Sequence, residues 1–171
     1  MKFYKIILFL LLISNAHSNE KFKLKKITDL NNPWSMTFLN NEEIMISDKE
    51  GQIQNINLKN KTINKVNHNL NYKVDGQGGL MEILKHKNNI YLCYTEDRGS
   101  GKTSTSIAKA KYTKDNLNFK NIFQANPPIN SGYHFGCRMV IQDDKYLYAS
   151  IGERGGGNIA QDFNQHPGSI I

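Results

Sequence analysis

The sequence predicts an all-β fold in which short antiparallel strands repeat along the chain, and three observations support this. One pattern occurs three times in the 171 residues: a short apolar strand, a polar turn, and a stronger strand rich in β-branched and aromatic residues. Each copy ends in an acidic residue that is followed within a few positions by a glycine. No segment shows the sustained periodicity of an amphipathic helix.

The repeated units are predicted as hairpins followed by further strands. In chain order, the predicted hairpins and additional strand candidates are 33–39 with 43–48, 52–58, 79–84 with 89–96, 106–112, and 137–141 with 145–153. Four short strands per unit, repeated at roughly 50-residue intervals, are typical of β-propeller blades. A β-sandwich would use similar strands, but it gives no reason for the acid-then-glycine ending to recur.

The number of repeats predicts an incomplete ring. A propeller closes with about four to eight blades, whereas this chain has room for roughly three. Residues 168–171 read as the opening of another strand. We therefore expect the N-terminal part of a longer protein, and the alternative is an open half-ring that assembles with a partner.

The first residues predict export from the cytoplasm. Lys2 and Lys5 are followed by the apolar run Ile6–Ile13 and by small residues at Ala16 and Ser18, which is the order found in secretory signals. We expect a signal peptide at 1–18 and a mature propeller part at 19–171. The alternative is an uncleaved anchor, but the run is shorter than the about 20 residues that span a bilayer. The predicted location is periplasmic or secreted, without stable membrane insertion.

The charge pattern argues against a nucleic-acid partner. The formal net charge is +7, but the lysines are scattered apart from a cluster at 21–26. Scattered lysines are typical of a solvated surface rather than of a nucleic-acid footprint.

The two cysteines leave two interpretations open. Cys93 and Cys137 each lie inside an apolar, strand-like stretch, so the favoured interpretation is a pair of small buried core residues. Export would also allow a disulfide between them. Their spacing does not match a zinc site.

Three loop clusters contain the candidate functional residues, at 75–79, 132–138 and 152–158. A histidine between glycines, such as His134, can act as a general base near neutral pH. Glu153 ends the strand that pairs with the strand after His134, so it can hydrogen-bond the imidazole. The alternatives are plain tight turns for the glycines, a structural role for His134, and a surface carboxylate for Glu153. Gln77 matters only if its amide faces the channel.

Taken together, these stretches resemble one family, the soluble pyrroloquinoline-quinone-dependent aldose sugar dehydrogenases of the glucose/sorbosone dehydrogenase type, which are six-bladed propellers. The matching stretches, in order, are Pro33-Trp34, Gly51, 76–80, 134–138, 152–155, 160–162, His166 and Gly168. Only about the first three blades of such a propeller would be present in this chain.

The resemblance implies a reaction and a role for each candidate residue. His134 would take the proton of the anomeric hydroxyl while the C1 hydride passes to the quinone, giving the lactone, and a bound calcium would act as a Lewis acid. Glu153 would orient the base. Gln77 would line the sugar and cofactor pocket, Asn158 or its rival Gln161 would supply a pocket amide, and Arg138 would support the site.

The resemblance also has departures and gaps. Met139 stands where the family usually has leucine, and Tyr133 where some members carry an acid that contacts the sugar, which leaves the preference for glucose open. The family's calcium ligands and most of its basic cofactor-binding residues lie in later blades, so this chain is expected to hold no metal ligand and to be inactive alone.

The implied partners are an aldose substrate and an electron acceptor of the cell envelope. A different interpretation is a non-catalytic propeller that binds a carbohydrate or a protein. A third is a calcium-dependent hydrolase on a similar propeller. This interpretation ranks last, because the loops offer mainly Glu153, Asp75 and Asp162 as carboxylates.

Overall fold

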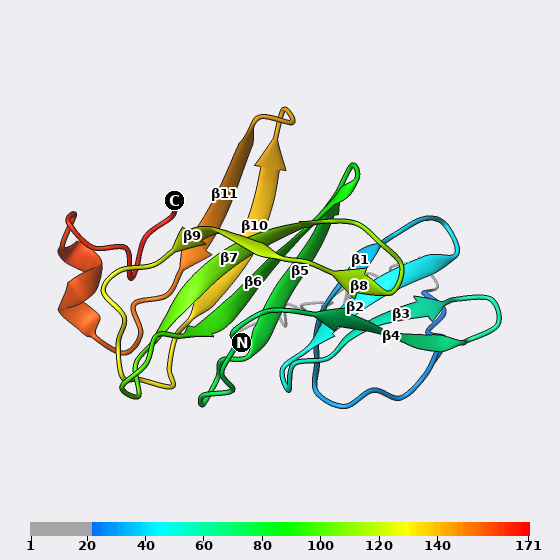
Figure 1. Cartoon of the computed structure of the whole chain (residues 1–171), viewed down its shortest axis with the longest axis horizontal. Coiled ribbons are helices and arrows are strands. Elements are labelled where there is room, and N and C mark those ends of the chain that lie inside the picture. Colours follow the sequence, from blue (N-terminus) through cyan, green and yellow to red (C-terminus); the bar gives the residue numbers. More distant parts are fainter. Residues whose placement is uncertain (1–21) are drawn as a thin grey trace, which may run out of the picture.

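The computed structural model describes residues 22–171, so the predicted signal peptide at 1–18 lies outside the described residues. Strands make up most of the regular structure (Figure 1). They are β1 Pro33–Phe38, β2 Glu43–Asp48, β3 Ile53–Asn57, β4 Ile63–His68, β5 Leu80–His86, β6 Asn89–Asp97, β7 Thr103–Lys111, β8 Asn116–Leu117, β9 Lys120–Gln124, β10 Gly136–Gln142 and β11 Tyr146–Ile151, and a short 3₁₀ helix, η1, spans Gly157–Gln161. Across residues 22–171, no helix has the length and apolar character needed to cross a lipid bilayer.

The first sheet has the strand order β1-β2-β3-β4-β8, and its first four strands pair antiparallel with their chain neighbours. β2 is buried on both faces, because Met45 packs into one hydrophobic cluster while Ile44 and Ile46 pack into another. β8 comes later in the chain, between β7 and β9, yet it pairs parallel with β4. A segment of the second repeat therefore completes the edge of the first sheet.

The second sheet has the order β5-β6-β7-β9, and β6 and β7 pair along their full nine-residue lengths. β7 begins at Thr103, three residues earlier than the sequence pattern predicts. Its first four residues are hydroxyl-bearing but buried. Thr105 Oγ1 donates to Phe135 O at 2.8 Å and Ser106 Oγ donates to Glu96 Oε2 at 2.6 Å. Buried hydroxyls with partners are tolerated in a core, so polar composition concealed the start of this strand.

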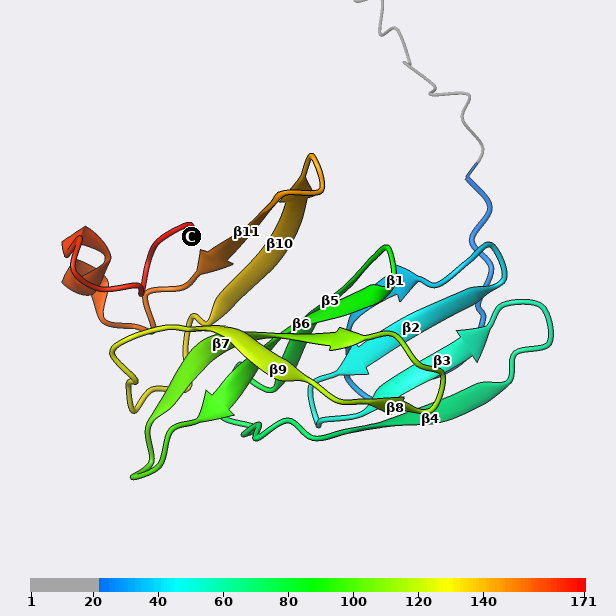
Figure 2. The same ribbon diagram turned by 45° about the horizontal axis from the view of Figure 1, so that its top comes forward.

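The third sheet is the hairpin β10-β11, and the segment that follows η1 is hydrogen-bonded to its edge. Ala149 exchanges two backbone hydrogen bonds with Ile171, each 3.0 Å long, and Ile151 N donates to Ser169 O at 2.8 Å. Residues 168–171 thus lie along β11 in the position of a third strand, as the sequence predicted. Figure 2 shows the three sheets following one another in chain order. The predicted class, an all-β fold of the β-propeller kind with three blades in this chain, is confirmed.

Hydrophobic clusters between the sheets hold the blades together. One lies between the first and second sheets and contains Met45, Val66, Leu80, Leu92 and Tyr94 among its buried members. The other lies between the second and third sheets and includes Met81, Ile107, Phe135 and Met139. Because successive residues of a strand face opposite sides of the sheet, β6 supplies Leu92 and Tyr94 to one cluster and Cys93 to the other.

The second cluster contains a disulfide between Cys93 in β6 and Cys137 in β10, with a Cα–Cα distance of 6.4 Å. The favoured interpretation from sequence, two unpaired core cysteines, is therefore wrong. Both residues are indeed buried, but packing of the third sheet on the second brings their side chains together. This proximity depends on the arrangement of the blades, which the local sequence around each cysteine does not show.

Candidate active site

His134 lies in the loop before β10, and its strained backbone conformation is held by contacts with neighbouring segments. Its φ is +48°, in the left-handed region that is unusual for a residue with a side chain. Its backbone N–H donates to Gln77 Oε1 at 2.9 Å, and its carbonyl accepts from Arg154 N at 3.1 Å. A Cβ atom on Gly152 would lie 1.9 Å from His134 O, so the strand end beside the loop must be glycine. Three separate segments therefore meet at the His134 backbone.

The His134 imidazole is paired with Glu153, as the sequence analysis expected of their strands. Nδ1 of His134 hydrogen-bonds Glu153 Oε1, and the same carboxylate oxygen accepts from Gly155 N at 3.1 Å. The hydrogen bond from His134, followed by backbone hydrogen bonds, lowers the pKa of Glu153 below its usual value. A carboxylate on Nδ1 favours the tautomer with the proton on that nitrogen. Nε2 then carries the lone pair, and the His134 side chain is 53% exposed, so it can reach a ligand.

Gln77 is held in a turn that fits directly against the His134 loop. Gln77 N donates to Gly132 O at 2.7 Å, in addition to the side-chain contact with His134 N. The turn has φ +54° at Gly76, and a Cβ there would lie 2.3 Å from Gly132 O. The glycines in both loops therefore allow a close backbone approach as well as a tight turn.

Replacing Gly76 with alanine is expected to lower the free energy of unfolding by about 3 kcal/mol, since it adds left-handed strain and a backbone clash. Gly157→Ala is the matched control. Gly157 has the same φ of +54°, but a Cβ there would meet nothing within 4 Å, so about 1 kcal/mol is expected. Chemical denaturation of the full-length protein measures both values. Equal losses in the two variants would contradict the close approach of the two loops.

Arg138, predicted as a site-supporting residue, extends from β10 towards β5. Its Nη1 donates to Glu82 Oε1 at 2.8 Å, and Met139 N also donates to the Glu82 carboxylate. Glu82 is nearly buried, whereas the Arg138 side chain is 78% exposed. Nη1 of Arg138 therefore links two blades through Glu82, and the rest of the guanidinium is available to a ligand.

Asn158 and Gln161 lie in η1, a few residues after Glu153. Both are exposed, and within the described part of the chain their side chains form no hydrogen bond with His134, Glu153 or Gln77. The structure thus brings together His134, Glu153 and Gln77, but it does not bring either amide into contact with them.

Arg154 is a buried residue of this region to which the sequence analysis gave no role. It is 3% exposed, and its guanidinium donates to the carbonyl oxygens of Tyr133 and Thr103 at 3.1 and 3.0 Å. An arginine directly after Glu153, between glycines, was part of the matched stretch. Arg154 is buried by contacts with residues distant in sequence, such as Thr103, so the sequence around Arg154 does not indicate its burial.

The other three histidines within residues 22–171 have contacts of their own, away from Glu153. His68 Nε2 contacts Gly51 O at 2.9 Å, His86 Nε2 contacts Asp144 Oδ1 at 2.8 Å, and His166 Nδ1 accepts from Asn126 N at 2.9 Å. Within residues 22–171, no group of three or more His, Cys, Asp or Glu side chains is placed to hold a metal ion.

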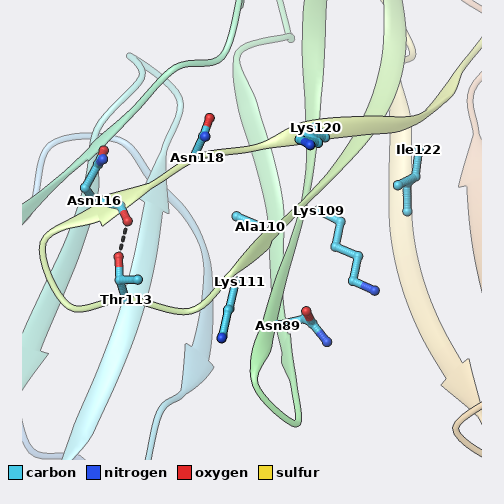
Figure 3. Close-up of a pocket in the computed structure, with 9 residues that line it drawn as sticks. All are labelled: Asn89, Lys109, Ala110, Lys111, Thr113, Asn116, Asn118, Lys120 and Ile122. Atoms are coloured by element: carbon cyan, nitrogen blue, oxygen red, sulfur yellow. Dashed lines mark hydrogen bonds between the residues drawn. The ribbon is translucent and has the colours of Figure 1, made fainter.

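A groove of about 590 Å³ lies elsewhere on the second sheet and does not belong to the His134 region. Figure 3 shows its lining, with Lys109 and Lys111 from the end of β7 and Lys120 from β9. The His134 loop contacts the other half of β7, where Thr105 donates to Phe135 O. Thr105 and Lys109 are four residues apart in β7, so at about 3.3 Å per residue the two regions are roughly 13 Å apart along the strand.

Comparison with known proteins agrees with this architecture. The sequence profile of the Glucose / Sorbosone dehydrogenase family matches residues 30–171. Aldose sugar dehydrogenase YliI of Escherichia coli (strain K12) is 25% identical over 151 residues, which cover 83% of this chain and 41% of that protein.

Solved structures share the fold. A glucose dehydrogenase crystal structure aligns with a TM-score of 0.80 at 26% identity, over 86% of this chain and 46% of the other. The PQQ-bound form of aldose sugar dehydrogenase from Streptomyces coelicolor aligns with a TM-score of 0.75 at 24% identity, over the same shares of the two chains. The present chain therefore spans less than half the length of the proteins it matches.

Proposed function

This chain belongs to the glucose/sorbosone dehydrogenase family, and on that premise we propose that the protein oxidises the C1 hydroxyl of an aldose to the lactone. The observation that carries the proposal is the His134–Glu153 pair, held in a loop where three segments meet. An exposed imidazole with a carboxylate on one nitrogen is the arrangement that a general base requires.

The chain's own residues account for the proton transfer. Glu153 holds the proton on His134 Nδ1, so Nε2 is free to accept the proton of the anomeric hydroxyl as its oxygen forms the carbonyl. The C1–H bond breaks with its electron pair, so the sugar loses a hydride and a proton in a two-electron oxidation. Pyrroloquinoline quinone supplies the chemistry of accepting that hydride when it is bound.

The residues present fit one side of such a cofactor. Pyrroloquinoline quinone carries carboxylates and carbonyl oxygens, and Arg138 presents an exposed guanidinium, the group best suited to carboxylates. We propose that Arg138 and Gln77 contact the cofactor, and that the amide of Asn158 or Gln161 joins them. Residues 22–171 hold no group of three or more acidic, histidine or cysteine side chains that could bind calcium.

We also propose that residues 1–18 are a signal peptide, that 19–171 are the N-terminal part of the propeller, and that the protein is periplasmic or secreted. The disulfide between Cys93 and Cys137 supports export, because disulfides persist in oxidising compartments. The electrons would then pass to an acceptor of the cell envelope.

The full-length protein, supplied with pyrroloquinoline quinone and calcium, should reduce a redox dye when an aldose is added. Dye reduction that requires the quinone would support the proposal. Binding of sugars without any dye reduction would instead favour a non-catalytic carbohydrate-binding propeller.

Replacing Glu153 with glutamine in the full-length enzyme is expected to lower kcat/KM by about 10²-fold, because the amide no longer selects the productive tautomer. The lowered pKa of Glu153 means that its carboxylate is lost only as the pH falls below the usual glutamate range. The ratio of wild-type to variant activity should therefore shrink once the pH falls below about 4, the usual glutamate range. A variant as active as the wild type at neutral pH would contradict this role.

A further inference from the structure

We propose that Arg154 is a positioning residue that holds the His134 loop in the conformation that a general base requires. The inference rests on the proposed function, but its structural part can be tested without turnover. Arg154 follows Glu153 directly, so one short segment supplies both the acid on the imidazole and the guanidinium beneath the loop.

The guanidinium contacts the loop on both sides of His134. Nε donates to Tyr133 O at 3.1 Å, and Nη2 donates to the carbonyl of Ser131. On the other side, the Arg154 Cζ atom lies 3.6 Å from the centroid of the Phe135 ring, where a cation is attracted to the aromatic face. The backbone N–H of Arg154 also donates to His134 O at 3.1 Å. Residues before and after the histidine are thus fixed to one side chain.

The same guanidinium fastens the loop to the second sheet. Nη1 donates to Thr103 O at 3.0 Å and Nη2 donates to Thr103 Oγ1 at 2.8 Å. Thr103 is the first residue of β7, a strand paired along its whole length with β6. Arg154 therefore fixes the loop to the second sheet. This contact helps to hold the disfavoured backbone conformation at His134.

The chemistry of the contacts indicates why an arginine is present. Burial lowers the pKa of Arg154 to about 10, so the side chain remains charged at neutral pH. Among the described residues no carboxylate forms an ion pair with it. The nearby Asp75 contacts Thr103 Oγ1 instead, at 3.4 Å. A well-packed apolar side chain would avoid the cost of burying this charge. An apolar side chain could not donate hydrogen bonds to the carbonyls of Ser131, Tyr133 and Thr103, whereas the planar guanidinium reaches all three.

The test uses the full-length protein and the variant Arg154→Lys, which keeps the charge but loses the planar donor set. With isotope-labelled histidine, the wild-type protein should show His134 imidazole nitrogen resonances typical of a proton on Nδ1. In the variant this signature should broaden or shift towards that of a free histidine. With quinone and calcium present, kcat should fall by about 10–10²-fold, while the KM for the sugar changes by less than about threefold. Arg98→Lys is the matched control, since Arg98 Nη1 donates to Ser104 Oγ at 2.9 Å, and Ser104 faces the opposite side of β7 from Thr103 and Thr105.

Two further variants test the inference if Arg154→Lys folds poorly. Thr103→Val keeps Arg154 but removes its hydroxyl acceptor, so a smaller change in the same direction is expected. Arg154→Ala should regain part of its kcat and of the His134 signature when guanidinium ion is added at concentrations well below those that denature. Unchanged His134 resonances and kcat in folded Arg154→Lys would overturn the inference. The inference would also be overturned if Thr103→Val left kcat and the His134 resonances unchanged and guanidinium ion did not restore activity to Arg154→Ala. If the wild type shows no turnover but the His134 signature depends on Arg154, the positioning role stands and the proposed function falls.

Discussion

Replacing His134 with alanine in the full-length enzyme is expected to lower kcat for aldose oxidation by about 10²–10⁴-fold, the range by which a positioned general base accelerates proton transfer. The physical reason is that Nε2 of His134 is the acceptor left free by the Glu153 contact on Nδ1. The KM should change much less, since the imidazole acts mainly in the transition state. Dye-coupled kinetics with saturating quinone and calcium measure both quantities.

His86→Ala provides a matched control for this variant. His86 is also partly exposed and also contacts a carboxylate, that of Asp144, but it ends β5 at the edge of the sheet opposite the Gln77 turn. Its replacement should leave kcat unchanged. Full turnover in the His134 variant, or an equal loss in both variants, would remove His134 from the role of base.

Removing the disulfide by the double change Cys93→Ala and Cys137→Ala is expected to lower the free energy of unfolding by about 4 kcal/mol. The bridge closes a loop with a sequence separation of 44 residues, and a cross-link of that length restricts the unfolded chain by about this amount. Both cysteines are buried, and alanine avoids leaving an unpaired hydroxyl in the core. Thermal and denaturant unfolding of the full-length protein measure the loss.

Reduction provides an independent control for the disulfide. Adding a thiol reductant should destabilise the wild-type protein and leave the double variant unchanged. A double variant as stable as the wild type would show that the bridge contributes little beyond the packing of the second hydrophobic cluster.

The hairpins were predictable because their signals are local. Alternating β-branched and aromatic residues on both sides of a polar turn specify β5 with β6 and β10 with β11. The expectation that Glu153 would lie beside His134 followed from the pairing of these strands. β4 was not predicted, because Val66 is its one fully buried residue and the strand shows no alternation. β8 and β9 were missed because they are short or mostly exposed.

The features that the sequence could not show depend on contacts between blades. The Cys93–Cys137 bridge, the Glu82 contact with Arg138, and the burial of Arg154 each join residues from different repeats or loops. A pattern read along one strand contains no information about the neighbouring blade. The sequence does not decide between Asn158 and Gln161, because the glycine run before Asn158 allows several backbone paths.

The parallel pairing of β8 with β4 couples the local unfolding of the first sheet to that of the second. Asn67 N bonds Asp115 O at 2.9 Å and Asn55 Nδ2 bonds Lys114 O at 2.9 Å, while Leu117 and Phe119 lie in the cluster between the sheets. In simple repeat proteins, each unit opens with a free energy of its own and is coupled only to its neighbours. Here the second unit supplies an edge strand to the first. The two units therefore share one cooperative opening, and amides of β4 should exchange with solvent no faster than this joint transition allows.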